Sequence, residues 1–219
     1  MQIPVKHSNS TKTPMKTKLF GLLCATVVLI TGCVVTSVYP FYTEKDLTFD
    51  PGLLGTFAET EAAQTNFWIF ERDKTNAYLV TFVEGANNRT NQDRTSQAHL
   101  FKLGGQLFLD FFTPQSNQDI EPEPLPTHLL MRVSQITPTL KMSPMTYDWL
   151  KNLLAKNPKA IRHIVIPTGY NSTDQRIVLT ADTAELQRFV LKHLNTKEAW
   201  NNDSDSQGLI RITPKAKAK

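Results

Sequence analysis

The chain has 219 residues, of which 24 are lysine or arginine and 20 are aspartate or glutamate. The first 32 residues hold four lysines and no acidic residue, so the remainder is balanced at 20 basic and 20 acidic residues. A nucleic-acid-binding protein shows a concentrated basic region, and the short basic end 211–219 is too small to predict one. The stretch from Cys33 onward is long enough for one domain that buries roughly 70% of its unfolded surface.

The N-terminal part has the pattern of a secretory signal. Lys16 and Lys18 precede an apolar run, 19–30. This run is shorter than the roughly 20 residues that a membrane span needs, and it has the length of a signal-peptide core. It ends in the segment Ile30–Cys33, with the sequence Ile-Thr-Gly-Cys. An aliphatic residue, two small residues and a cysteine in this position resemble the bacterial lipobox.

The resemblance implies cleavage between Gly32 and Cys33, so that residues 1–32 form a signal peptide. In that family the cysteine carries diacylglycerol on its sulfur and a further acyl chain on its amine, and such multiple chains anchor a protein firmly to a membrane. No other cofactor is expected. An uncleaved N-terminal membrane helix, or a buried helix with an incidental cysteine, is the alternative. The polar leader before Met15 is unusually long, so Met15 is a second candidate for the start.

The residues around Cys33 also bear on location and thiol chemistry. Val34 follows the cysteine, and in enterobacteria-like sorting a residue other than Asp there implies the outer membrane, facing the periplasm, if the host is Gram-negative. Cys24 leaves with the signal peptide and Cys33 is consumed by lipid, so no disulfide or cysteine metal site is expected. Residues 33–43 form the lipidated tether. Its aromatic end, 39–42, is expected to dock on the domain, with the membrane interface as the alternative.

Residues 44–200 are predicted to form a single β-rich domain. Short runs with aromatic or β-branched residues, separated by turn signals, are typical of a barrel or sandwich. A proline-rich acidic segment, 113–126, cannot pair as a strand and predicts a surface loop. The predicted strands are 53–58, 67–72, 77–84, 97–103, 106–112, 127–133, 136–142, 161–166 and 176–180.

The strongest local signal is a β-hairpin at 97–112. Its two strands flank Gly104-Gly105, a two-residue loop that suits a primed turn. This loop fixes the register. One face then carries His99, Phe101, Leu103, Phe108 and Asp110, with His99 opposite Asp110 and Phe101 opposite Phe108. The other face carries Ala98, Leu100, Leu107, Leu109 and Phe111. Both faces are largely apolar, so the hairpin is expected to be covered on two sides.

Two amphipathic helices are predicted in the C-terminal part. Ser143-Pro144 has the signature of an N-cap followed by proline in the first turn, and the apolar stripe after it ends at Asn157. Asp182 and Glu185 have capping-box spacing before a second apolar stripe. Residues 201–219 are polar and basic, and we expect a flexible tail. The predicted fold class is therefore mainly β (α+β), an antiparallel barrel or sandwich of about eight or nine strands with two helices.

The first predicted strand carries Gly55-Thr56-Phe57. Together with the meandering strands and a terminal helix, this resembles lipocalin-type barrels, in which the tryptophan of a Gly-x-Trp packs at the barrel floor. Here the aromatic residue is Phe57, and the sequence does not identify an arginine partner for it. The part after Cys33 also resembles uncharacterised bacterial lipoproteins built on a small β-fold, and that resemblance implies no settled activity.

His99 opposite Asp110 is the candidate catalytic pair. A carboxylate beside an imidazole fixes its tautomer and raises its basicity, as general-base catalysis requires. No serine stands in a Gly-x-Ser-x-Gly context that would supply a nucleophile. A cross-strand polar pair that only supports the sheet is the alternative interpretation.

Four residues are candidates to line a ligand pocket inside a barrel: Phe101, Phe108, His128 and Arg132. The last two share one face of the next strand, but the histidines show no metal-binding spacing, so no metal site is predicted. The leading hypothesis is a non-enzymatic, lipid-anchored envelope protein that binds a small apolar ligand or an envelope partner. The alternative is an envelope hydrolase that uses the histidine–aspartate pair.

Overall fold

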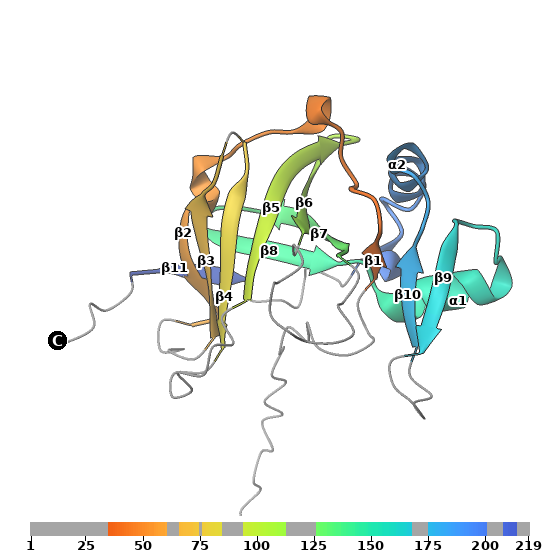
Figure 1. The fold of residues 1–219 in the computed structure, drawn as a ribbon. Coiled ribbons are helices and arrows are strands. Elements are labelled where there is room, and N and C mark those ends of the chain that lie inside the picture. Colours follow the sequence, from red (N-terminus) through yellow and green to blue (C-terminus); the bar gives the residue numbers. More distant parts are fainter. Residues whose placement is uncertain are drawn as a thin grey trace, which may run out of the picture.

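The centre of the protein is a closed, eight-stranded antiparallel β-barrel (Figure 1). The structure is a computed structural model that describes residues 35–60, 66–74, 76–84, 94–112, 126–167, 175–200 and 208–213. Each barrel strand pairs with the next barrel strand along the chain, and the last pairs with the first to close the ring. The strands are β2 (Gly55–Ala58), β3 (Asn66–Arg72), β4 (Tyr78–Glu84), β5 (Arg94–Leu103), β6 (Gln106–Phe112), β7 (His128–Gln135), β8 (Thr139–Pro144) and β11 (Leu209–Ile212).

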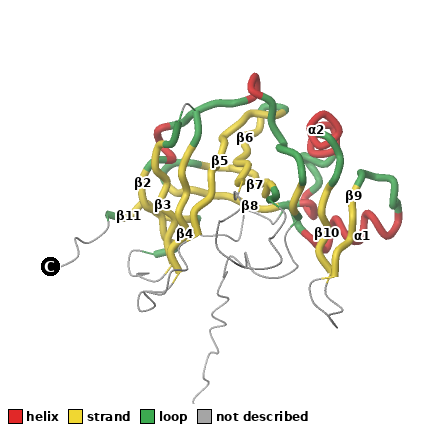
Figure 2. Tube along the Cα trace, viewed as in Figure 1, coloured by secondary structure: helices red, strands yellow, loops and turns green. Residues whose placement is uncertain are grey.

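The predicted fold class is confirmed. The protein is mainly β, and its two helices, α1 (Tyr147–Lys156) and α2 (Thr183–Lys192), lie in the C-terminal part of the chain. Figure 2 shows them on one side of the barrel, next to β9 and β10. All nine predicted strands are present in the described residues. Two further strands, β1 (Thr36–Ser37) and β11, occupy segments that we assigned to the tether and the tail.

A small sheet extends from one edge of the barrel strand β7. The C-terminal part of β7 pairs with β8, and its first two residues pair with β1. β1 runs parallel to β10 (Gln175–Leu179), and β10 pairs antiparallel with β9 (His163–Pro167), which is the outermost strand. In Figure 1 these three strands lie beside α1 and α2, on the opposite side of the barrel from β2, β3 and β4.

The barrel interior is filled by one hydrophobic cluster. Aromatic rings contact one another there, with Phe70 against Phe57 at 5.8 Å and against Tyr78 at 6.3 Å between ring centroids. An eight-stranded barrel is just wide enough for its own side chains. The buried members are Leu53, Phe57, Trp68, Phe70, Tyr78, Val80, Ala98, Leu100, Leu109, Phe111, Met131, Val133 and Leu140.

A second hydrophobic cluster lies outside the barrel, between the outer face of β5, β6 and β7 and the two helices. The hairpin contributes alternate residues to the two clusters, because successive strand residues point to opposite faces. The predicted register and the expected burial of both hairpin faces are thereby confirmed. The buried members are Val35, Phe41, Phe101, Leu103, Phe108, Leu130, Met145, Leu150, Leu154, Ile161, Ile177, Leu179, Ala181, Leu186, Phe189, Val190, Ala199 and Trp200.

The predicted start of the first helix is wrong. Ser143 and Pro144 belong to β8, where they pair with β7, and α1 begins at Tyr147 with Thr146 in the N-cap position. The capping signature is local, and pairing with a neighbouring strand overrides it. The second helix follows its signal, because the carboxylate of Asp182 accepts a hydrogen bond from the Glu185 N–H at 2.9 Å.

The boundary that we predicted between the domain and a tail at 201–219 is also wrong. β11 lies within that range and closes the barrel by pairing with β2 and β8. Four residues between polar segments are too short a run for periodicity to reveal. Residues 201–207 and 214–219 lie outside the described part, as does most of the predicted loop 113–126.

Arg211 of β11 supplies the arginine partner that the sequence did not identify for Phe57. Its guanidinium donates hydrogen bonds to the backbone carbonyls of Gly52 (2.6 Å) and Leu54, and its Cζ lies 4.7 Å from the centroid of the Phe57 ring. Gly55, at φ 131°, leaves the space that this side chain crosses, because a Cβ there would collide with the guanidinium. The last barrel strand is thereby fastened to the segment that leads into the first barrel strand, β2.

Within the described ranges, neither helix is long and apolar enough to cross a membrane.

Candidate functional site

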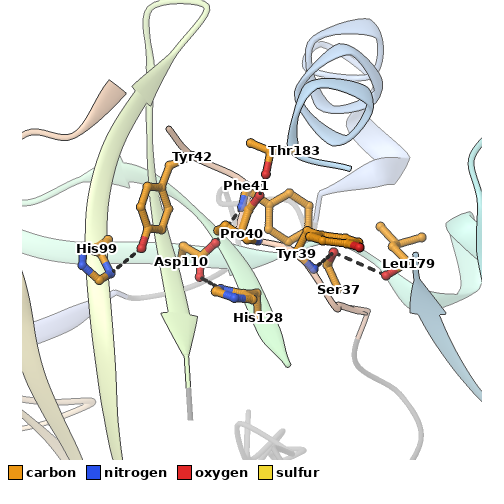
Figure 3. A network of polar contacts seen from close by, with 10 residues as sticks. All are labelled: Ser37, Tyr39, Pro40, Phe41, Tyr42, His99, Asp110, His128, Leu179 and Thr183. Carbon is orange, nitrogen blue, oxygen red and sulfur yellow. Dashed lines mark hydrogen bonds and ion pairs between the residues drawn. The ribbon is translucent and has the colours of Figure 1, made fainter. Parts of the chain in front are cut away.

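The polar centre of the second cluster is Asp110, a carboxylate on β6 with no exposed surface (0%). Its Oδ2 accepts a hydrogen bond from the backbone N–H of Phe41 at 2.8 Å, and its Oδ1 lies 2.6 Å from Nδ1 of His128 on β7 (Figure 3). A carboxylate is buried at a large cost unless it is paired and hydrogen-bonded. These two partners therefore allow the charge to stay inside the protein.

The imidazole of His99 has a different partner from the one that we expected. His99 and Asp110 are register partners on β5 and β6, as predicted. The hydrogen bond recorded for His99, however, joins its Nδ1 to the hydroxyl of Tyr42 at 3.1 Å, and the two rings lie 4.7 Å apart between centroids (Figure 3). Two side-chain pairs, Asp110 with His128 and Tyr42 with His99, replace the single pair of the sequence interpretation.

Burial shifts two pKa values in this network. Burial, with the negative charge of Asp110 as a smaller cause, raises the pKa of the Tyr42 hydroxyl to about 12. Burial also lowers the pKa of His99, and the nearby Asp110 charge only partly opposes this shift. Tyr42 and His99 are therefore both neutral at pH 7, and they form a neutral hydrogen bond beside the Asp110 charge.

The network fastens the N-terminal segment 35–46 to the rest of the protein. Beyond the Asp110 contact, the side chain of Gln187 on α2 donates to the Phe41 carbonyl at 3.0 Å and to the Asp46 carboxylate at 2.8 Å. The hydroxyl of Thr183 donates to the carbonyl of Pro40 at 2.8 Å. The predicted docking of the aromatic segment on the domain is confirmed, because Phe41 is buried (1% exposed).

The four candidate pocket residues are not inside the barrel, and the expectation of that location is wrong. Phe101 and Phe108 have no exposed surface and stack on each other at 5.5 Å within the outer cluster. His128 points to Asp110 on the same outer side. The reason is that successive residues of a strand point to opposite faces. The residues that face the barrel interior are the sequence neighbours of the candidates, such as Leu100 and Leu109.

Arg132, the fourth candidate, joins the barrel to the segment that follows α2. Its guanidinium donates to the side-chain oxygen of Gln106 at 3.2 Å and to the carbonyl of Leu194 at 3.4 Å, and it lies 5.9 Å from the ring centroid of Trp200. These are contacts within the protein. Whether the four residues line a ligand site stays a prediction.

The hydrogen bond between Asp110 and His128 decides whether this pair could act as a general base. An ionised carboxylate only accepts hydrogen bonds, so opposite such a carboxylate Nδ1 of His128 is the donor. A general base has this orientation, but it also needs a nucleophile or substrate within reach. The remaining recorded contact of the His128 ring is stacking on Phe112, at 4.8 Å between centroids. The observed geometry is that of a structural fastening, and the catalytic role of His99 and Asp110 stays a prediction.

Two predicted features lie outside this geometry. Gly32 and Cys33, the expected cleavage and lipidation residues, precede the described part of the chain, which begins at Val35. For metal ions, the described ranges contain no group of three or more His, Cys, Asp or Glu side chains that could hold one.

Sequence reasoning did not identify Gln187 and Arg211 as contact residues, and it predicted the docking of 39–42 without naming His99 as the partner of Tyr42. The aromatic run before residue 43 gave a signal, because it lacks the Ser/Gly spacer that commonly separates a lipidated cysteine from its domain. Gln187 gave none, since its partners Phe41 and Asp46 lie more than 140 residues away in the sequence.

Comparison with known proteins gives no relative. No protein-family model, curated protein or solved structure matches the chain.

Proposed function

We propose that the protein is a lipid-anchored envelope protein that works by binding an envelope partner rather than by catalysis. The observation that supports this most directly is the burial of the first residue that the structure describes. Val35 is buried (3% exposed), and Thr36 and Ser37 form a strand between β7 and β10. Cys33 stands two residues earlier in the sequence, so a lipid on it would hold the folded body close against the membrane.

Of the two binding roles considered, a protein partner is favoured over an enclosed apolar ligand. The barrel interior is occupied by large side chains, and Phe57, Phe70, Tyr78 and Leu100 within it are at most 1% exposed. The outer cluster is covered by α1 and α2. A binding role for such a filled body therefore belongs to its surface.

The hydrolase alternative is less well supported. Both oxygens of Asp110 are engaged by groups that hold the fold together, the Phe41 backbone and His128. His99 is engaged by Tyr42. No contact in the described network brings a serine or threonine hydroxyl to either histidine.

Metabolic labelling with palmitate tests the anchor. The variant Cys33→Ala should lose the label and leave the membrane fraction, because it lacks the sulfur that receives the lipid. Cys24→Ala is the matched control, since this cysteine lies in the expected signal peptide, and it should label like the unaltered protein. Undiminished labelling of Cys33→Ala would refute the anchor.

Native mass spectrometry of the detergent-extracted mature protein tests the choice between ligand and partner. We expect the mass of the lipidated chain alone, because the interior is filled by side chains. A bound mass of a few hundred daltons, constant between preparations and released only when the protein unfolds, would support a small ligand and contradict the partner hypothesis.

A further inference from the structure

The outermost strand, β9, presents an apolar edge to solvent. Ile164, Val165 and Ile166 are consecutive and are 44%, 45% and 38% exposed. β9 pairs with β10 on one side, and the described residues provide no partner strand for its other side. Exposed, apolar edge strands are avoided in soluble proteins unless something covers them.

The strand register places this edge beside the point where the chain leaves for Cys33. Thr36 of β1, Val178 of β10 and Ile164 of β9 form one row across the sheet. Neighbouring strands lie about 4.8 Å apart, so Ile164 is about 10 Å from Thr36. Three residues back from Thr36, Cys33 is within reach of about 11 Å. The apolar edge therefore lies within about 20 Å of the expected lipid.

The strand directions decide which end of β9 lies level with the start of β1. β1 and β10 are parallel, and β9 is antiparallel to both. Going backwards along β1 therefore follows β9 forwards, from Ile164 toward Ile166. The N-terminal end of β1 and the C-terminal end of the apolar edge thus lie at the same end of the sheet.

A basic side chain adjoins the apolar edge. Arg176 is the register partner of Ile166 and is exposed. Lys156, the last residue of α1, and Lys159 are exposed in the chain before β9 begins. The exposed Asp148 follows Tyr147, whose hydroxyl donates a hydrogen bond to the carbonyl of Gln175, the register partner of Pro167. Apolar residues beside an arginine are suited to the boundary between anionic headgroups and acyl chains.

We propose that the Ile164–Ile166 edge of β9 rests in the headgroup region of the bilayer and orients the body on the membrane. This inference depends on the proposed lipid anchor at Cys33. A headgroup region contains water, so the free backbone groups of β9 stay hydrated while the side chains reach the acyl boundary. The edge also fits a strand from a partner or from a second copy, but the short reach from Cys33 favours the lipid surface.

A fluorescent label at this edge tests the proposal. In the lipidated mature protein an introduced cysteine is the only free thiol, so Val165→Cys accepts a nitrobenzoxadiazole label selectively. Leu79→Cys is the matched control, because Leu79 is also an exposed apolar strand residue (37%), on β4. Both are reconstituted in vesicles of phosphatidylethanolamine and phosphatidylglycerol, with and without doxyl-labelled lipid. Unchanged thermal unfolding shows that both labelled variants are folded.

We expect a blue shift and at least twofold stronger doxyl quenching at position 165 than at position 79. Equal, water-like emission at both positions would overturn the proposal. A blue shift at 165 that grows with protein density and is insensitive to doxyl lipid would also overturn it, since it would indicate a second copy on the edge. Palmitate labelling before reconstitution distinguishes the lipid anchor from the contact of β9 with the bilayer. Protein without the label refutes the anchor. Labelled protein with a water-exposed position 165 refutes only the contact of β9.

Discussion

At the scale of single residues, one buried charge explains how the N-terminal segment is held. Asp110 accepts a hydrogen bond from the Phe41 backbone on one oxygen and contacts His128 with the other. Removing one partner of such a buried group leaves the remaining polar atoms buried without a hydrogen bond. The network is therefore more sensitive to substitution than surface ion pairs such as Arg162 with Asp182.

Asp110→Asn is predicted to lower the free energy of unfolding by about 2–3 kcal/mol, because hydrogen bonds to a charged group contribute about 1.5–3 kcal/mol. The measurement is urea unfolding at pH 7. Asp148→Asn, an exposed carboxylate on α1, is the control and should stay within about 0.5 kcal/mol of the unaltered protein. Equal effects of the two substitutions would show that the Asp110 network does not stabilise the fold.

The lowered pKa of His99 predicts an acid-sensitive fold. Burial places its folded pKa below its unfolded value of about 6.5, so between the two values the unfolded state binds more protons. The free energy of unfolding is therefore full above about pH 6.5 and falls as the pH decreases toward the folded pKa. His193, whose pKa burial also lowers, contributes in the same direction.

The variant His99→Gln isolates this contribution, because glutamine keeps a polar group near Tyr42 but does not titrate. Urea unfolding between pH 7 and pH 5 should show a shallower loss of stability for the variant than for the unaltered protein. If the free energy of unfolding fell equally with pH in both proteins, His99 would not be a source of the acid sensitivity.

The hairpin shows how far sequence reasoning extends at this scale. Gly104-Gly105 was sufficient to predict which residues face each other across the turn, since the register is a local property. The partners of the Asp110 carboxylate were not predictable, because Phe41 is 69 residues away and only the packed fold brings it near.

At the scale of elements, two short strands that the sequence analysis assigned to the tether and the tail complete the sheet. β1 has two residues and extends the sheet from the barrel, and β11 has four and closes the ring. β1 was missed because alternation cannot be recognised over two residues, and β11 was missed because its four residues stand between polar and basic segments. The longer strands β3 to β7, whose alternation is sustained, were all predicted.

Arg211→Ala is predicted to lower stability by about 1–2 kcal/mol, because charge-assisted hydrogen bonds are stronger than neutral ones but this side chain is partly exposed to water. Arg211→Lys should recover only part of the loss, since an ammonium cannot match the planar fork that reaches two carbonyls. The measurement is again urea unfolding, with the exposed Lys151→Ala as control. A loss no larger than that of the control would mean that Arg211 does not fasten the barrel.

At the scale of the whole molecule, the chain builds two cores on the two faces of one hairpin. The barrel interior follows from alternation in eight strands, and the fold class was predictable for that reason. The outer core was not, because it combines the N-terminal segment, both helices and Trp200 from distant parts of the chain. The candidate pocket was assigned to the wrong side of the barrel. Alternation along a strand shows which residues share a face, but it does not show which face points into the barrel.

The proposed function depends on a lipidated Cys33 three residues before the buried strand β1, and mass spectrometry of the mature N-terminal peptide tests this most directly. Peptides of the membrane-extracted protein should begin at Cys33, carry the mass of a diacylglyceryl group and an additional acyl chain, and include none from residues 1–32. A mature chain that begins at Met1 or Met15, or one with an unmodified Cys33, would contradict the account.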